Sequence, residues 1–456
     1  MSIRPGFARI SPVLLLRPLA TTLLAFAFLA IASLAPGHAA VSIQKVESPG
    51  GVTAWLVEDY SVPLISIRFA FRGGSTQEPA GKDGLARLMS GLFDEGAGDL
   101  DRETFQEQLD ASGAEMSFNA SADSFQGSMR MLEEDREAAF ALLALAVNAP
   151  RFDAEPIARI RAQLISSIEA RARDPQTEAG IAWANAIYGD HPYARRNEGT
   201  PEALLSVTAE DIAGFHRRLF ARDNLVVGVV GAIDAETLAG ELDRVFGSLP
   251  EAADLSPVAT IVPRLDQVLD LDFDLPQASI RLAYPGLARD DPDFFAAYLM
   301  NHILGGGTFS SRLFTEVRER RGLTYGIGSS LLNLRHASAL VIGTSTRPDR
   351  AADALGIIRE EVRRMAEEGP TEAELASAKA FVLGAYAINN LDNSSAIART
   401  LVELQVEGLG MDYIERRADY IESVTLDDVR NIARRLLAVE PAVMVVGGRT
   451  EAEAKD

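Results

Sequence analysis

Apolar and polar residues alternate along Val62–Phe71, a segment rich in isoleucine, phenylalanine and valine, and this period of two predicts a strand. Four later segments carry apolar residues at helical spacing: Gly84–Phe93, Arg102–Ser112, Glu133–Ala146 and Ala154–Arg173. Thr208 and Thr425 are each followed two and three residues later by acids, a pattern that predicts a helix N-cap before a final strand. The order of elements predicts an α+β fold, with helices packed on one face of a mainly antiparallel sheet.

The pattern occurs twice. Ser66–Gly73 matches Ser279–Gly286 at an offset of 213 residues, and Val207–Gly231 matches Val424–Gly448 at an offset of 217. Matched blocks in the same order at nearly equal offsets predict two homologous halves, each of typical domain size. We therefore predict an N-terminal half at 41–250, a proline-containing linker at 251–263 and a C-terminal half at 264–456.

The first forty residues have a different composition. Three arginines precede an apolar run at Leu19–Ala35, and small residues follow it at Gly37, Ala39 and Ala40. This order predicts a secretory signal peptide over residues 1–40 and a periplasmic protein, with an uncleaved membrane anchor as the alternative. No later stretch of the sequence is long and apolar enough to span a bilayer, so no membrane contact is expected after cleavage.

Charge and cysteine content exclude several classes of function. The net charge is −21, and removing residues 1–40 takes away three arginines and no acid. Such an acidic chain is not expected to bind nucleic acid or anionic lipid. The sequence contains no cysteine, which excludes disulfides, thiolate metal sites and a cysteine nucleophile.

Four short blocks lead into the first predicted helix: Gly73-Gly74-Ser75, Glu78-Pro79, Gly81-Lys82 and Gly84-Leu85-Ala86. Together they resemble the lead-in to the active helix of the pitrilysin (insulinase-like) zinc metallopeptidases, which continues His-x-x-Glu-His. The two histidines bind zinc there, the glutamate between them takes a proton from metal-bound water, and a glutamate from a later helix is the third ligand. The resemblance implies a clamshell of two homologous α+β halves.

The positions that match this zinc set are Arg87, Ser90 and Gly91, with Ser167 at or near the place of the distant glutamate. A guanidinium has no acceptor lone pair, a lone serine is no general base, and glycine has no side chain. The mature chain has four histidines, and no two of them lie three or four residues apart. We therefore predict no metal or other cofactor in this chain. We assign His191 a structural loop role, and interpret His216 and His302 as surface or capping residues.

The second half retains another block, Leu304–Tyr325, which resembles the family segment that carries an arginine and a tyrosine seven residues apart. In the family these two side chains reach across to the zinc site in the other half, and here they match Arg318 and Tyr325. Ser310 is predicted to cap the helix and Gly322 to end it. By its chemistry, a tyrosine can donate a hydrogen bond to a scissile carbonyl or its oxyanion, and an arginine can hold a peptide carbonyl.

From spacing alone, Arg318 would lie on a solvated helix face and Tyr325 in the core; the surrounding match favours the site. The glycine loop Gly305-Gly306-Gly307 lacks the following lysine of a phosphate loop, so a turn that allows close backbone approach is expected.

The resemblance implies a non-catalytic, substrate-binding subunit of a heterodimeric peptidase. Zinc is then expected in a homologous partner that carries His-x-x-Glu-His, and peptides are the expected substrates. Two alternatives remain at this point: a structural subunit with no need of Arg318 or Tyr325, and a stand-alone peptide-binding protein.

Overall fold

Two β-sheets form the framework of the structure, a computed structural model that describes residues 42–447. The predicted signal peptide lies outside the described residues. The strands of the first sheet are β1 (Gln44–Glu47), β2 (Thr53–Glu58), β3 (Leu64–Arg72), β4 (Glu115–Ala120), β5 (Ser124–Leu132) and β6 (Leu225–Gly231). Those of the second are β7 (Val268–Leu271), β8 (Ala278–Pro285), β9 (Thr324–Leu334), β10 (Ala337–Thr346) and β11 (Ala442–Val446).

Helices lie at equivalent places in the two halves, between β3 and β4 or β8 and β9 and again before the last strands, β6 and β11, and the first half has further helices. In the first half they are α2 (Leu85–Ser90), α3 (Arg102–Ala111), α4 (Arg136–Asn148), α5 (Ala154–Arg171), α6 (Pro175–Tyr188), α7 (Pro201–Ser206), α8 (Ala209–Leu219) and α9 (Ala235–Phe246). In the second they are α10 (Phe294–Asn301), α11 (Ala351–Glu368), α12 (Glu372–Asn390), α13 (Ser394–Val406), α14 (Tyr413–Ser423) and α15 (Leu426–Leu437). Between 42 and 447 no helix is both long and apolar enough to cross a membrane.

The strand orders show the duplication directly. The first sheet runs β1-β2-β6-β3-β5-β4 and the second β7-β11-β8-β10-β9, so the second repeats the first without β1. In each sheet the equivalent pair, β2 with β6 and β7 with β11, is parallel, and all other neighbours are antiparallel. The predicted pair of homologous α+β halves is confirmed.

Local sequence rules account for the strands and caps that were predicted. Along β3, Ile65, Ile67, Phe69 and Phe71 are at most 1% exposed, because alternate side chains of a strand share a face and here that face is the core. Thr208 accepts a hydrogen bond from the Asp211 N–H, and the Asp211 carboxylate accepts one from the Thr208 N–H, which closes a capping box before α8. Thr425 begins α15 in the same way.

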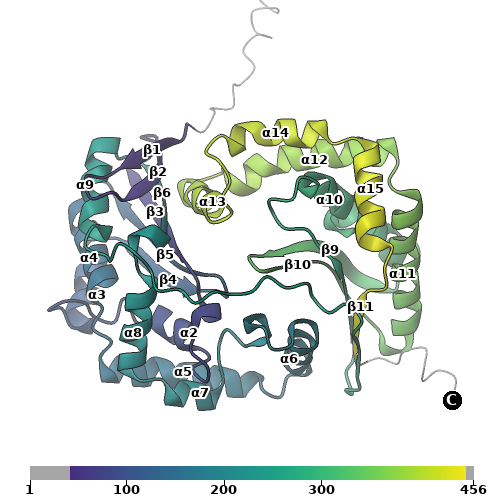
Figure 1. Cartoon of the computed structure of the whole chain (residues 1–456), viewed down its shortest axis with the longest axis horizontal. Helices are drawn as coiled ribbons and strands as arrows, with labels where there is room; N and C mark the ends of the chain where they lie inside the picture. Colours follow the sequence, from purple (N-terminus) through teal and green to yellow (C-terminus); the bar gives the residue numbers. More distant parts are fainter. Residues whose placement is uncertain (1–41, 448–456) are drawn as a thin grey trace, which may run out of the picture. The chain divides into compact units, whose positions relative to one another are not determined.

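The halves exchange helices, which was not predicted. We expected helices on one face of each sheet, but α13 of the second half packs on the other face of the first sheet, against β3 and β6 (Figure 1). Reciprocally, α6 of the first half places Trp183 and Ile187 in a cluster with Met444 and Val446 of β11. From Ile43 onward the chain therefore forms a single contact unit.

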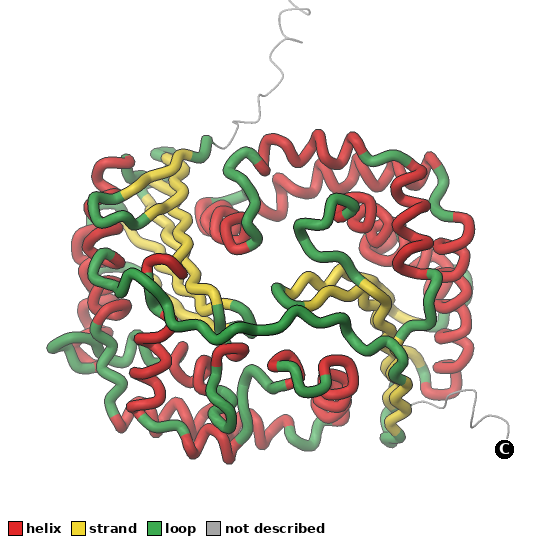
Figure 2. Tube along the Cα trace, viewed as in Figure 1, coloured by secondary structure: helices red, strands yellow, loops and turns green. Residues whose placement is uncertain are grey.

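The connection between the halves is irregular from the end of α9 to the start of β7 (Figure 2). It includes the predicted linker and contacts both halves: the Ile261 N–H donates to the His336 carbonyl at 2.8 Å, and the Arg264 N–H to the Ile187 carbonyl at 2.9 Å.

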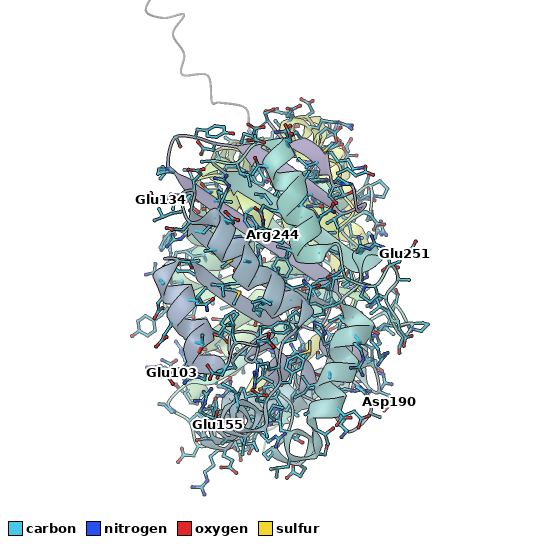
Figure 3. The ribbon with its side chains drawn as sticks, turned by 90° about the vertical axis from the view of Figure 1, so that its left-hand side faces the viewer. Glu103, Glu134, Glu155, Asp190, Arg244 and Glu251 are labelled. Carbon is cyan, nitrogen blue, oxygen red and sulfur yellow. The ribbon has the colours of Figure 1, made fainter. Side chains whose placement is uncertain are left out.

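The outer side of the first half carries both acidic and basic side chains, among them Arg244 (Figure 3). The labelled acids there are all exposed: Glu103, Glu134, Glu155, Asp190 and Glu251. Their distribution matches the strongly negative net charge.

Candidate functional site

The four degenerate zinc positions lie on α2, directly after it, and on the neighbouring helix α5. Arg87 is exposed and donates to the Asn119 side-chain oxygen at 3.3 Å, whereas Ser90 is buried and donates to the Arg87 carbonyl at 2.8 Å. Gly91 lies beyond the last residue of α2, where its N–H already closes the helix. On α5, the exposed Ser167 hydroxyl accepts a hydrogen bond from Arg171 at 3.3 Å.

These residues do not fit a zinc ion. Zinc in proteins is held by three or four imidazole, thiolate or carboxylate groups, and none of the four positions supplies one. Across the described residues, no three His, Asp or Glu side chains gather in a way that would hold a metal.

Glu78, from the lead-in to α2, has a structural role that sequence reasoning missed. Its buried carboxylate accepts hydrogen bonds from the N–H groups of Gly84 at 3.1 Å and Ala86 at 2.8 Å, at the start of the helix. Burial outweighs these two bonds and raises the pKa of Glu78 to about 8. Glu78 precedes Gly84 and Ala86 by six and eight residues in the sequence, whereas an N-cap side chain binds N–H groups only two or three residues later, so the usual pattern does not reveal this role.

Two histidines are fixed by structural contacts. His191 accepts from the Tyr193 N–H at 3.2 Å, and its other ring nitrogen lies 2.9 Å from the Ala259 carbonyl, which agrees with a loop role. Of the two roles predicted for His216, surface or capping, the surface role is wrong, whereas its contact with a carbonyl in the last turn of α4 agrees with capping. His216 is 8% exposed, lies among phenylalanine rings and contacts the Val147 carbonyl at 2.9 Å. Burial lowers its pKa to about 4.

Arg318 and Tyr325 meet at one cavity in the second half. Arg318 belongs to the π-helix η7 (Phe314–Glu319), and Tyr325 is the second residue of β9. Both line a cavity of about 530 Å³, together with Gln277, Ser345 and others. Tyr325 is 90% exposed, so it is not a core residue. The Arg318 guanidinium stands 4.6 Å from the centre of the Phe314 ring, a cation–π distance.

The end of this helix follows the prediction, and its beginning does not. Gly322 takes a left-handed φ of 62°, and its N–H donates to the Arg318 carbonyl at 2.9 Å. Ser310 does not cap the helix, because its hydroxyl donates to the Gly307 carbonyl at 3.0 Å. The π-helical form was not predicted; such segments are common at functional sites.

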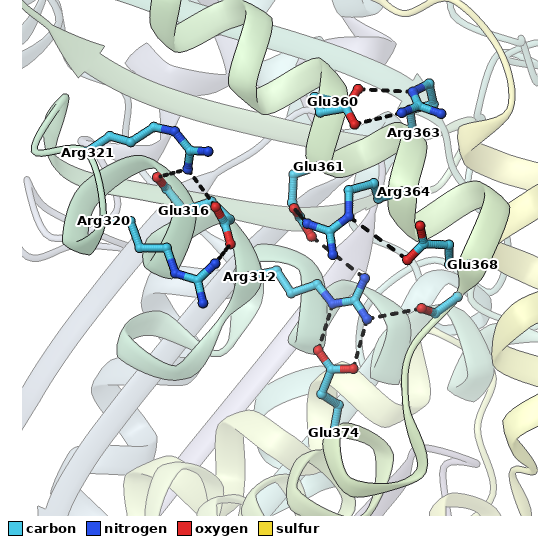
Figure 4. Close-up of polar contacts among 11 residues, drawn as sticks. Arg312, Glu316, Arg320, Arg321, Glu360, Glu361, Arg363, Arg364, Glu368 and Glu374 are labelled. Atoms are coloured by element: carbon cyan, nitrogen blue, oxygen red, sulfur yellow. Dashed lines mark hydrogen bonds and ion pairs between the residues drawn. The ribbon is translucent and has the colours of Figure 1, made fainter.

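Ion pairs hold the helix in place (Figure 4). Arg312 donates to both carboxylate oxygens of Glu374, at 2.7 and 2.8 Å, and to the Gly369 carbonyl at 3.0 Å. Burial opposes ionisation of Glu374, but the bonds from Arg312 and Thr371 prevail and lower its pKa to about 2. This fork ties the start of the helix to α12.

The neighbouring arginines differ in their partners. Glu316 binds Arg320 at 2.6 Å and Arg321 at 2.5 Å, so these two belong to an ordinary charged helix face (Figure 4). The Arg318 guanidinium has no ion-pair or hydrogen-bond partner in the part of the chain that the structure describes. Its N–H donors are therefore available to a ligand.

A β-bulge aims Tyr325. Thr344 of β10 pairs with Ile327 and Thr346 pairs with Thr324, so Tyr325 and Gly326 together face the single residue Ser345. Bulges of this kind redirect side chains and are frequent beside active sites. Nothing in the local sequence signalled it.

The glycine loop is part of a second π-helix, η5 (His302–Gly306). A Cβ atom on Gly305 would lie 2.5 Å from the Ser329 hydroxyl and 2.8 Å from its backbone nitrogen, so glycine allows η5 to approach β9. Close approach at Gly305 agrees with the expectation, but Gly305 and Gly306 are helical and only Gly307, which follows η5, forms a turn. Gly306 lies against Asn301, the last residue of α10, and Gly307 lies against His302, the first residue of η5.

Two similar halves with this strand order and a residual helix at the zinc position define a protein of the insulinase type. The sequence profile described as insulinase (peptidase family M16) matches residues 56–200, and that of the peptidase M16 inactive domain matches residues 206–382. The chain belongs to peptidase family M16, as the resemblance implied.

Its relatives carry divergent names. An uncharacterized zinc protease of Streptomyces coelicolor is 27% identical over 91% of this chain and 92% of its own. The non-peptidase homolog YmxG of Helicobacter pylori is 23% identical over 83% of this chain and 87% of its own. Family membership therefore does not by itself imply peptidase activity.

Solved structures share the fold. A peptidase M16 inactive domain from Pseudomonas fluorescens superposes with a TM-score of 0.83 at 27% identity, covering 90% of this chain and 98% of its own. The periplasmic protease PqqL of Escherichia coli gives a TM-score of 0.77 at 15% identity, over 90% of this chain and 46% of PqqL. The second likeness concerns the fold alone.

Proposed function

We propose that this protein is the non-catalytic, substrate-binding subunit of a periplasmic, heterodimeric zinc peptidase. A homologous partner with an intact His-x-x-Glu-His helix would hold the zinc, and this chain would present Arg318 and Tyr325 to the bound peptide. One observation carries the proposal: these two side chains line a single cavity, while α2 offers only Arg87, Ser90 and Gly91 where a zinc ligand set would be.

The chemistry of the two side chains suits peptide hydrolysis. The exposed Tyr325 hydroxyl is free to donate a hydrogen bond to the scissile carbonyl, and this bond strengthens as negative charge develops on that oxygen. Arg318, placed by Phe314 and without an acidic partner among the described residues, is free to donate to a neighbouring peptide carbonyl. The zinc in the partner would supply the activated water, and this chain would orient the substrate.

Export to the periplasm is supported by the basic and apolar pattern of residues 1–40. The absence of cysteine makes the protein independent of the redox state of its compartment. A protein of the same fold, PqqL, is described as a periplasmic protease.

The test uses the chain copurified with its zinc-motif homologue and a fluorogenic peptide. We expect Tyr325→Phe to lower kcat/KM by roughly 10²–10³, the usual effect of removing one oxyanion donor, and Arg318→Ala to lower it as well. Matched controls are Tyr60→Phe, another exposed tyrosine, and Arg320→Ala, a neighbour already paired with Glu316. Both controls should keep nearly full activity, and gel filtration should show that every variant still forms the pair.

Full activity of both Tyr325→Phe and Arg318→Ala in an intact pair would favour the structural-subunit alternative. Stoichiometric zinc and unaided peptide hydrolysis by the isolated chain would contradict the proposal outright.

A further inference from the structure

A polar trough adjoins the cavity of Arg318 and Tyr325. It has a volume of about 330 Å³ and is lined by residues of β8 to β11 with Gln176 of α6. Gln277, Tyr325 and Ser345 line both cavities, so the two meet at Tyr325. An extended peptide held at Tyr325 would continue into this trough.

Small residues line part of the trough. Gly326, Ser279, Gly343 and Ser345 lie along it, and a Cβ atom on Gly326 or Gly343 would meet no described atom within 4 Å. Packing therefore does not require either glycine, although each weakens its strand by roughly 0.5–1 kcal/mol relative to alanine. The β-bulge accounts for glycine at Gly326, whereas Gly343 pairs in regular register and has no such reason. Glycine in a strand interior often marks a place where a ligand approaches the backbone.

Arg281 supplies the charge of the trough. It is exposed and stands directly across from Gly343 in the β8–β10 register, so its side chain shares a face with that open position. Within residues 42–447 its guanidinium has no ion-pair or hydrogen-bond partner. By contrast, Arg347 and Arg350 of the adjoining cavity are paired with Asp349 and Asp353.

The two cavities together are cationic on an otherwise acidic protein. Their lining holds four arginines and, as the sole acid among the described lining residues, Glu319. Two of these arginines, Arg281 and Arg318, have no acidic partner in the described structure. Charge complementarity therefore favours an anionic ligand group.

We propose that Arg281 determines substrate specificity by binding a carboxylate of the peptide, either an aspartate or glutamate side chain or the C-terminal carboxylate. The proposal rests on the proposed function, because the same peptide must pass Tyr325. Arg281 lies two strands across and about two residues along from Tyr325, which places it roughly 12 Å away by standard sheet spacings. The carboxylate would then be three to four residues from the bond held at Tyr325.

The experiment measures binding to the isolated chain, so it needs no partner and no hydrolysis. The probes are fluorescein-labelled ten-residue peptides: amidated peptides with one glutamate placed at each position in turn, the all-glutamine analogue as amide, and that analogue as free acid. The proteins are the wild type, Arg281→Gln, Arg281→Glu and, as a matched control, Arg359→Gln. Arg359 is also exposed and without a described partner, but it lies on α11, which contacts the core face of the second sheet.

We expect the wild type to bind one glutamate peptide, or the free acid, about tenfold more tightly than the neutral peptide, as for one charge-assisted pair. Arg281→Gln should abolish this preference, Arg281→Glu should reverse it, and Arg359→Gln should retain it. Tighter binding of an amidated glutamate peptide would indicate that a side-chain carboxylate is bound, and tighter binding of the free acid would indicate the C-terminal carboxylate.

Equal affinity of the wild type for acidic and neutral peptides, binding of neither, or a preference that survives Arg281→Gln would overturn the proposal. Its failure is distinct from that of the proposed function, because Arg281→Gln leaves Arg318 and Tyr325 in place. Loss of hydrolysis in Tyr325→Phe with no charge preference refutes only the role of Arg281. A charge preference lost in Arg281→Gln, with Tyr325→Phe fully active, refutes only the proposed function.

Discussion

Replacing Gly228 by alanine tests the packing of α13 of the second half on β6 of the first. Gly228 is buried, and a Cβ atom there would lie 2.8 Å from the Ala398 carbonyl oxygen and 2.9 Å from the Leu401 Cβ. Neither atom can rotate away, since one is backbone and the other is fixed to it. The helix would have to move by about half an ångström to reach ordinary contact distance.

Two effects of opposite sign set the magnitude. Overpacking of a buried contact destabilises by about 1–3 kcal/mol. Alanine also lowers the conformational entropy of the unfolded chain, which stabilises the folded state by about 0.4–1 kcal/mol. We therefore expect Gly228→Ala to lower the free energy of unfolding by roughly 1–2 kcal/mol.

Gly240→Ala is the matched control. Gly240 is exposed on α9, and a Cβ atom there has no described neighbour within 4 Å. In a helix interior this exchange should stabilise by roughly 0.5–1 kcal/mol. The assay is urea denaturation of the mature chain followed by circular dichroism, with the midpoint compared at unchanged slope. Equal stability of the two variants would refute the packing of α13 against β6.

Three further predictions concern stability. His216 has a pKa of about 4 in the fold against an ordinary 6.5, so it is neutral in the folded protein at neutral pH. As the pH falls from 6.5 toward 4, the unfolded chain takes up a proton at this histidine before the folded chain does, and the free energy of unfolding should drop by about 2 kcal/mol at pH 5. Urea denaturation at a series of pH values should show a flatter pH profile for His216→Phe. Glu374→Gln should lower the free energy of unfolding by about 1–3 kcal/mol at pH 7. Because the pKa of Glu374 is lowered from 4.5 to about 2, this loss relative to wild type should persist down to pH 4.5 and fade toward pH 2. A loss that stays constant with pH would contradict the ion pair with Arg312. Trp183→Ala should lower the free energy of unfolding by about 3–5 kcal/mol, because it leaves a cavity between α6 and β11. Thermal unfolding should show whether both sheets still melt in one step.

The fold was predicted where a few neighbouring residues determine the structure. The alternation in β3, the capping boxes at Thr208 and Thr425 and the end of a helix at Gly322 are all local patterns. The packing of α13 on the first sheet depends on contacts between residues about 170 or more positions apart, such as Gln405 with the Val227 carbonyl. Helical spacing reveals an apolar face, but it does not reveal which sheet that face covers.

The site was predictable to the same extent. The match of the surrounding block to the family segment, and not the spacing alone, indicated Arg318 and Tyr325, and the structure brings both to one cavity. The bulge that aims Tyr325 arises from the register between β9 and β10, which neither strand specifies alone. The burial of His216 was missed for a related reason. The pattern of its amphipathic helix predicts a buried apolar stripe, but it does not show that the Val147 carbonyl is available as a hydrogen-bond partner for an imidazole in that stripe.

The exchange of α6 and α13 has a consequence for how the protein is made. All strands of the first sheet are synthesised well before α13. One apolar face of that sheet therefore stays uncovered until residues some 170 positions later have been synthesised. If the gene were cut in the connection before β7, each fragment would carry the other's missing cover, and the two would be expected to regain their fold only when mixed. In this respect the single chain behaves as a dimer whose subunits were joined end to end.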